Sequence, residues 1–169
     1  MIKTTNLKTK YVPIEQMKSG RWKVNFGFEP YYEVDEDGNK KETNLGTWIE
    51  GWMMNKPSIE QLKNYILNAI NKEVDEKILT GFVWNDIPVW LSTENQFNYK
   101  AAYDLAVQTN GANLPITFKF GSTEEPIYHT FTSVEELMGF YVAAMSYINE
   151  TLAKGWARKD AIDWSVYQL

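Results

Sequence analysis

The sequence contains no cysteine and a single histidine, His129. Without thiols, disulfides, thiolate catalysis and cysteine-based zinc sites are excluded. One histidine forms a metal site only together with several carboxylates at fixed spacing, and no such set stands near His129 in the sequence. We therefore interpret His129 as a side chain on the face of a strand, and we expect neither a metal nor a cofactor.

Long apolar runs and a stripe of basic residues are also missing. No run approaches the roughly 20 apolar residues that span a bilayer, and the opening MIKTTN lacks the apolar segment of a signal peptide. The 17 basic residues are scattered among 22 acidic ones, for a net charge of −5. Because phosphate neutralisation supplies most non-specific affinity for nucleic acids, we expect neither nucleic acid nor a membrane as a partner. We expect the protein in a cytoplasm or inside a larger particle.

Aromatic residues, by contrast, are plentiful, at 15% of the chain with seven tryptophans. Aromatic side chains suit a rigid core, and Trp and Tyr also suit contact surfaces. The candidates for a contact surface are Trp48, Trp52, Trp84 and Trp90. Trp48 and Trp52 are expected on the same face of one strand. A core or protein-contact role is favoured over sugar stacking for these rings.

Hydrophobic periodicity predicts strand pairs that alternate with helices. Residues 21–28 alternate as a strand, Asp35 to Asn39 form a turn, and residues 43–54 return as the second strand of a long hairpin. The Ser58 and Gln61 pair is spaced as a capping box, and helical spacing continues to about Leu79. Residues 2–10 are polar and are expected to be a mobile arm, or one ordered only on a partner.

The second half repeats this order twice. The elements expected there are a hairpin of residues 82–84 and 89–91 around a turn at 85–88, a helix from a Thr93–Gln96 capping box to Thr109, a strand pair within 114–131, a long helix capped by Ser133 and Glu136, and a short terminal helix over 158–164. Short turns between neighbouring strands imply antiparallel pairing. We therefore predict an α+β fold, with antiparallel β-hairpins alternating with three main helices in a single compact domain. Within it we expect an N-terminal arm (1–20), a hairpin plus helix (21–79) and an α+β module (80–169), the last two packed together as one domain.

Catalytic motifs are not found. The Asp35-to-Asn39 segment faintly resembles a calcium loop, but its glycine falls at the wrong position, so a hairpin turn is the better interpretation. Asp160 and Asp163 stand one helical turn apart, which is more typical of a solvated helix face than of an acid–base pair. No nucleophile elbow and no glycine-rich phosphate loop occurs. We expect a protein that is not an enzyme.

The second half resembles a known family. The resemblance is carried by residues 81–84 and 90–92, the helix over 95–108, the strand pair over 116–131, the segment Thr132 to Leu137 at the position of a T-x-x-E-L motif, and Lys159 followed by Ile162 at the end of the last helix. Over about residues 80–164 the chain resembles the DUF4376-type domain found in bacteriophage tail and tail-fibre-associated proteins. The family has no agreed catalytic residues. The resemblance implies other phage structural proteins as partners, self-association, and a place in the virion or in the cytoplasm of the bacterial host.

Three functions remain open from the sequence. The leading hypothesis is a non-enzymatic bacteriophage structural or tail-fibre/virion assembly protein acting through protein–protein contacts. The first alternative is a carbohydrate-binding module that contacts the host surface, which predicts Trp48, Trp52 or Trp90 exposed together on one face. The second alternative is a small-ligand-binding counter-defence protein, which predicts a concave pocket lined by aromatic side chains.

Overall fold

The computed structural model describes residues 1–168 and has an α+β fold, with 42% helix and 32% strand. It contains the predicted antiparallel hairpins and the three main helices. The chain divides into two compact units, one made of Met1–Ala69 together with the residues from Arg158 onward, the other of Ile70–Ala157. The domain boundaries predicted from the sequence, and the packing of residues 21–79 and 80–169 as one domain, stay predictions.

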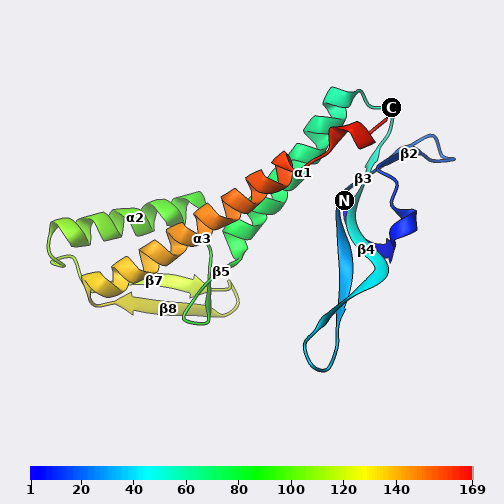
Figure 1. Cartoon of the computed structure of the whole chain (residues 1–169). Coiled ribbons are helices and arrows are strands. Elements are labelled where there is room, and N and C mark those ends of the chain that lie inside the picture. Colours follow the sequence, from blue (N-terminus) through cyan, green and yellow to red (C-terminus); the bar gives the residue numbers. More distant parts are fainter. Residues whose placement is uncertain (169) are drawn as a thin grey trace. The chain divides into compact units, whose positions relative to one another are not determined.

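The first unit is built on a four-stranded antiparallel sheet (Figure 1). In spatial order its strands are β1 (Ile2–Leu7), β4 (Lys40–Met53), β3 (Trp22–Val34) and β2 (Ile14–Gln16), and a 3-10 turn, η1 (Lys8–Lys10), follows β1. The predicted long hairpin is therefore confirmed as the β3–β4 pair, and both strands extend further toward the turn than the sequence indicated.

Residues 2–7 differ from expectation. Instead of a mobile arm they form β1, whose register with β4 runs from Ile2 opposite Glu50 to Leu7 opposite Leu45. Only Thr4 in this strand is even partly buried. Backbone hydrogen bonds to β4, rather than burial of side chains, hold β1 in place, and a polar composition carries no signal for that kind of order.

Helix α1 (Ile59–Thr80) begins at the predicted capping box. Ser58 Oγ accepts a hydrogen bond from the Gln61 backbone nitrogen (3.2 Å), and Gln61 Oε1 accepts one from the Ser58 nitrogen (2.8 Å). In the first unit the core contains the strand residues Val24, Phe26 and Trp48, the α1 residues Leu62 and Ile66, and Tyr167. Tyr167 follows the 3-10 turn η2 (Trp164–Val166). The terminal helix predicted over 158–164 is wrong, because the long helix α3 (Val134–Asp160) continues through Arg158 and only η2 follows it.

The second unit packs helices and two hairpins around an aromatic core. Its elements are the end of α1 from Ile70, β5 (Phe82–Trp84), β6 (Ile87–Val89), α2 (Thr93–Gln108), β7 (Ile116–Gly121), β8 (Pro126–Phe131) and most of α3 (Figure 1). Phe140 on α3 lies at the centre, with ring contacts to Phe82, Trp84, Tyr99, Phe118, Phe120 and Phe131. Much of the aromatic surplus is therefore used inside this unit.

In the second unit the predicted turns and helix ends are present, but the β5–β6 turn and the cap of α2 differ from the predicted positions by one or two residues. The β5–β6 turn consists of Asn85 and Asp86 alone, both at positive φ (48° and 64°), so Ile87 and Pro88 belong to the strand and not to the turn. The cap of α2 is Ser92 rather than Thr93, with Ser92 Oγ accepting from the Asn95 nitrogen at 3.2 Å. The predicted stop after Thr109 is confirmed at Asn110 and Gly111, which have positive φ. None of the helices within residues 1–168 combines the length and apolar character that crossing a bilayer requires.

Candidate functional site

The outer part of the β3–β4 hairpin lacks the cover that the rest of the sheet has. On β4 the register with β1 ends at Leu45, and on β3 the register with β2 ends at Val24. We call residues 28–45 the distal ribbon. No residue of the distal ribbon is buried, and its large apolar side chains Phe28, Tyr31, Tyr32 and Val34 are between 36% and 62% exposed. Figure 1 shows β3 and β4 running on to their turn as a two-stranded ribbon.

Each face of the distal ribbon carries an aromatic ring beside charged groups. Tyr32 lies opposite Glu42, and Glu33 lies opposite Lys41. Because successive side chains of a strand point to opposite faces, Tyr32 and Val34 share one face, while Tyr31 and Glu33 share the other. The ribbon can therefore contact a partner from either side.

Two irregularities bend the ribbon away from a flat strand pair. The register shifts between Phe26 and Glu29, where Gly27 has a φ of +66°, and again between Pro30 and Tyr32. A bulge increases the local twist, and a proline offers no backbone donor to a neighbouring strand. Both features are devices that protect an exposed strand pair from indiscriminate edge-to-edge pairing.

The tip of the ribbon is a tight turn held by Asp35. One carboxylate oxygen, Oδ1, accepts hydrogen bonds from the backbone nitrogens of Asp37 (3.1 Å) and Asn39 (2.8 Å), and Gly38 has a φ of +84°. The hydrogen bond from the Asn39 backbone is the main cause that lowers the pKa of Asp35. This confirms the predicted hairpin turn. Across residues 1–168 no cluster of three or more acidic or histidine side chains is placed to hold a metal ion.

An aromatic cluster supports the ribbon where it leaves the sheet. A Cβ atom at Gly46 would lie 2.4 Å from Cε2 of Phe28, so the Phe28 ring lies directly over this glycine. The Phe28 ring is 5.0 Å from Tyr11 and 6.3 Å from Trp48, centroid to centroid, and Tyr11 is 5.5 Å from Trp48. Trp48 is 1% exposed, so the base of the ribbon is anchored in the core.

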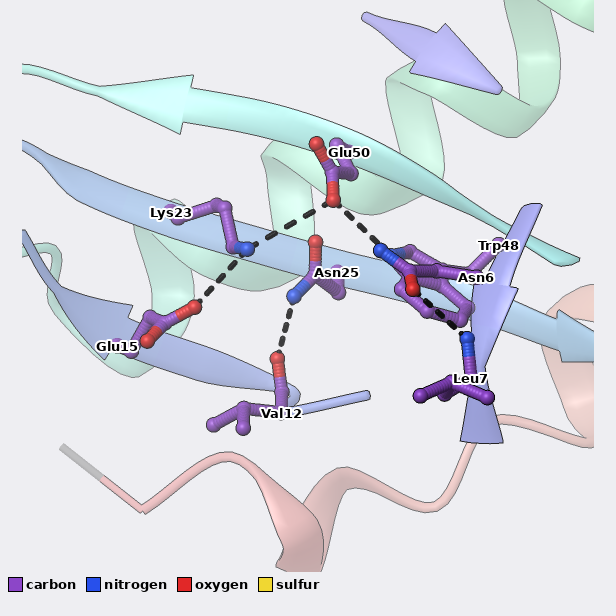
Figure 2. A network of polar contacts seen from close by, with 8 residues as sticks. All are labelled: Asn6, Leu7, Val12, Glu15, Lys23, Asn25, Trp48 and Glu50. Atoms are coloured by element: carbon purple, nitrogen blue, oxygen red, sulfur yellow. Dashed lines mark hydrogen bonds and ion pairs between the residues drawn. The ribbon is translucent and has the colours of Figure 1, made fainter. Parts of the chain in front are cut away.

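A polar network lies beside this cluster and links three strands (Figure 2). The Nζ atom of Lys23 on β3 is 3.0 Å from Glu15 on β2 and 3.6 Å from Glu50 on β4. Glu50 also accepts a hydrogen bond from Trp48 Nε1 at 3.3 Å. Burial acts to lower the pKa of Lys23, but the hydrogen bonds and charges of Glu15 and Glu50 outweigh it and raise that pKa.

Asn25 is the buried centre of the same region. Its Nδ2 donates to the Val12 carbonyl (2.6 Å), as Figure 2 shows, and its backbone nitrogen donates to the Pro13 carbonyl (2.8 Å). Its own carbonyl accepts from the hydroxyls of Tyr11 (3.3 Å) and Tyr167 (3.1 Å), and burial raises the pKa of both phenols. The chain before β2 is thereby fixed to β3, and the ribbon projects from a rigid base.

The four tryptophans singled out from the sequence have different environments. Trp48 is in the core, and Trp84 packs edge-on against Phe140 at 5.5 Å with its Nε1 buried. Trp52 is 40% exposed, with the Arg21 guanidinium 5.4 Å from the centroid of its ring, and Trp90 is 51% exposed. Trp48 therefore offers no surface to a partner, and Trp52 and Trp90 belong to different units.

The remaining candidates have structural partners. His129 lies on β8 as predicted, with Nε2 3.0 Å from Glu136 Oε1 and its ring 4.5 Å from that of Phe131. Glu136 belongs to the predicted cap of α3, since its nitrogen donates to Ser133 Oγ (3.2 Å) and its other carboxylate oxygen accepts from the Thr132 nitrogen (3.3 Å). Asp163 caps η2 by accepting from the Ser165 nitrogen at 2.9 Å.

These observations define an α+β protein with an exposed two-stranded ribbon that is supported at its base. Comparison with protein families matches residues 61–168 to the Domain of unknown function (DUF4376). The chain belongs to this family, and the match begins inside α1, earlier than the residue 80 that the sequence motifs indicated. The distal ribbon lies outside the matched residues. Neither the curated proteins nor the solved structures gave a match to the chain.

Proposed function

We propose that this chain is a non-enzymatic bacteriophage structural or tail-fibre/virion assembly protein that acts through protein–protein contact at the distal ribbon. The observation that carries the contact role is a ribbon exposed on both faces, with Tyr31, Tyr32 and Val34 held out from a rigid base. The bacteriophage setting rests on the likeness of residues 80–164 to domains of tail-associated proteins.

A ribbon of this kind has the physical properties of a contact element. An isolated two-stranded hairpin is only marginally stable in water, so exposing apolar side chains on one brings no benefit to the fold itself. Tyrosine combines a large apolar ring with a polar end and few rotatable bonds, and it is enriched where interfaces derive most of their energy. The ion pairs of Lys23 and the hydrogen bonds of Asn25 fix the base of the ribbon, so ordering this base costs little entropy when a partner binds.

The carbohydrate-binding alternative has less support. It relies on a platform of exposed rings from Trp48, Trp52 and Trp90, and burial of Trp48 removes one of the three. The ligand-binding alternative finds no specific observation in its favour among the described residues.

The test replaces residues 31–43 with an Asn-Gly turn between Pro30 and Asn44, in the genome of the phage that carries the gene. The shortened protein should accumulate normally, because the replaced residues are exposed or, at Thr43, only partly buried. The yield of infectious particles should fall by about tenfold or more, as expected when the anchor residues of an interface are lost. The double variant Tyr31→Ala/Tyr32→Ala should reproduce the loss.

The matched control is Tyr128→Ala, which removes a tyrosine from β8 that is more exposed (66%) than Tyr31 (40%) or Tyr32 (45%). A normal particle yield from the shortened protein, or an equal loss with Tyr128→Ala, contradicts the contact role of the ribbon. Mass spectrometry of purified particles then separates a virion component, which is retained, from an assembly factor, which is absent. A gene found in no phage genome contradicts the bacteriophage setting.

A further inference from the structure

The first unit separates its charges along the sheet. Residues 1–27 contain six basic side chains and one acidic one, Glu15; the basic residues are Lys3, Lys8, Lys10, Lys18, Arg21 and Lys23. The distal ribbon, residues 28–45, contains six acidic and two basic side chains; the acidic residues are Glu29, Glu33, Asp35, Glu36, Asp37 and Glu42. The ribbon therefore has a net charge of −4 beside a segment with a net charge of +5.

Only part of this charge is neutralised within one copy. Lys8 pairs with Glu42, and Lys23 pairs with Glu15 and Glu50. Among residues 1–168, no carboxylate lies within 4 Å of the amino group of Lys3 or Lys10. Likewise, no basic group among these residues lies within 4 Å of the carboxylates of Asp35, Glu36 and Asp37 at the ribbon tip.

The ribbon tip cannot reach Lys3 in its own copy. Lys3 pairs with Ile49, nine residues along β4 from Lys40 at the tip. At about 3.3 Å per residue this separation is about 30 Å along the strand, which is several times the Debye length of about 8 Å at physiological salt. The sheet register therefore keeps the acidic tip and Lys3 apart, and only another molecule can bring these two groups together.

The basic segment also has an unfilled docking position. β1 is the outermost strand of its sheet, so the backbone groups along its far edge have no strand partner in the described chain. Ile2, Lys3 and Leu7 on this strand are exposed. The edge thus combines free backbone donors and acceptors with apolar and cationic side chains, which complement a ribbon of apolar and anionic side chains.

We infer that the distal ribbon of one copy docks on the β1–η1 segment of a second copy, and that a two-fold dimer makes this contact reciprocally. A two-fold arrangement uses both complementary surfaces of each copy and closes the assembly. This inference rests on the contact role of the ribbon proposed above and names a second copy of the chain as its partner.

The test is sedimentation equilibrium of the purified full chain across a range of concentrations and salt. The wild-type protein should dimerise at about 50 mM salt, and the dimer should weaken as salt rises, because opposite charges at the rim of an interface are screened. One variant, Glu36→Lys/Asp37→Lys, reverses the charge of the ribbon tip, and a second, Lys3→Glu/Lys10→Glu, reverses the charge of the β1–η1 segment. Self-association of each variant should be weaker than that of the wild type by about tenfold or more. All of these side chains are exposed, and circular dichroism confirms that each variant is folded.

Mixing the two variants is the decisive experiment. In one contact of the mixed dimer a basic tip then meets an acidic β1–η1 segment, and in the other an acidic tip meets a basic β1–η1 segment. A heterodimer of wild-type affinity should therefore form. The matched control, Glu124→Lys/Glu125→Lys, reverses two adjacent exposed acids in the β7–β8 turn and should leave wild-type dimerisation unchanged.

Three results would overturn the inference: a wild-type protein that stays monomeric at low salt, a mixture that fails to associate, or a control that dissociates the dimer as strongly as the tip reversal. A monomeric wild type together with a loss of particles on shortening the ribbon leaves the proposed function standing and assigns the ribbon to a different protein. If the protein dimerises with the predicted charge dependence but shortening the ribbon leaves the particle yield normal, the dimer inference stands and the proposed function is contradicted.

Discussion

At the scale of single residues, Asn25 and Gly46 determine how the ribbon is supported. Asn25 joins the chain before β2, the strand β3 and the phenol of Tyr167 through its side chain and backbone. Gly46 lets the Phe28 ring pack closely against the strand, where any other residue would place a Cβ atom 2.4 Å from Cε2 of the ring. Neither role can be recognised from one sequence, because hydrophobic alternation places both residues in strands without indicating which groups they contact.

Replacing Asn25 with alanine should destabilise the protein by about 1–3 kcal/mol. The change leaves the Val12 carbonyl without the donor that reaches it at 2.6 Å, in a region where Asn25 itself is fully buried. Urea unfolding followed by tryptophan fluorescence measures the difference. Asn98→Ala, at an exposed position on α2, serves as the control and should change stability by less than about 0.5 kcal/mol. Equal effects of the two substitutions would contradict the role given to Asn25.

At the scale of elements, helices and hairpin turns could be predicted and β1 and the ribbon could not. The capping boxes at Ser58 and Ser133, the Asp35 turn and the stop at Gly111 are local signals that the backbone follows. Strand β1 and the outer halves of β3 and β4 bury almost nothing, so no hydrophobic alternation marks them. The bulge at Gly27 also changes the facing of Phe28 relative to Phe26, which the simple alternation of residues 22–28 did not anticipate.

Close packing between α1 and α3 gives a prediction at this scale. A Cβ atom at Gly155 would lie 2.6 Å from Cγ2 of Val74, a stiff β-branched side chain. Gly155→Ala should therefore destabilise the protein by about 1–3 kcal/mol through overpacking, although alanine favours a helix over glycine by about 1 kcal/mol. Thermal unfolding measures the effect.

The double variant Gly155→Ala/Val74→Ala tests whether this contact is the cause. Removing the Val74 methyl groups makes room for the new Cβ, so the two substitutions should be less harmful together than the sum of the single effects. If the losses of stability are additive, the close approach of residue 155 to Val74 is not the cause of the destabilisation.

At the scale of the whole chain, acidic residues prevail in the second unit and charges are segregated in the first. Residues 70–157 contain eleven acidic and five basic side chains, whereas the first unit is close to neutral. The net charge of −5 gave no indication of this segregation, because it becomes meaningful only once the sheet register separates residues 1–27 from the ribbon. The family resemblance, in turn, was visible in the sequence because turn and cap residues recur at fixed offsets in residues 80–164.

Hydrogen exchange over the whole chain should rank the elements by burial. Amides of the distal ribbon should exchange fastest among the strands, because their hydrogen bonds are exposed and no apolar core covers them. Amides around Phe26 and Trp48, and those around Phe140 on α3, should be the slowest. The exchange should be measured at high salt and low protein concentration, where self-association is weak. A ribbon as well protected as the sheet around Phe26 would contradict the separation of base and ribbon.

The bare strand pair beyond Gly46 also acts as an adjustable spacer. Adding one residue to each strand would lengthen it by about 3.3 Å and exchange its two faces, whereas adding two to each would lengthen it by about 7 Å with the faces kept. Such changes leave the core unaltered, because the pairs around Trp48 and Asn25 lie on the other side of Gly46. The reach of this molecule can thus vary in steps, with little consequence for its folding.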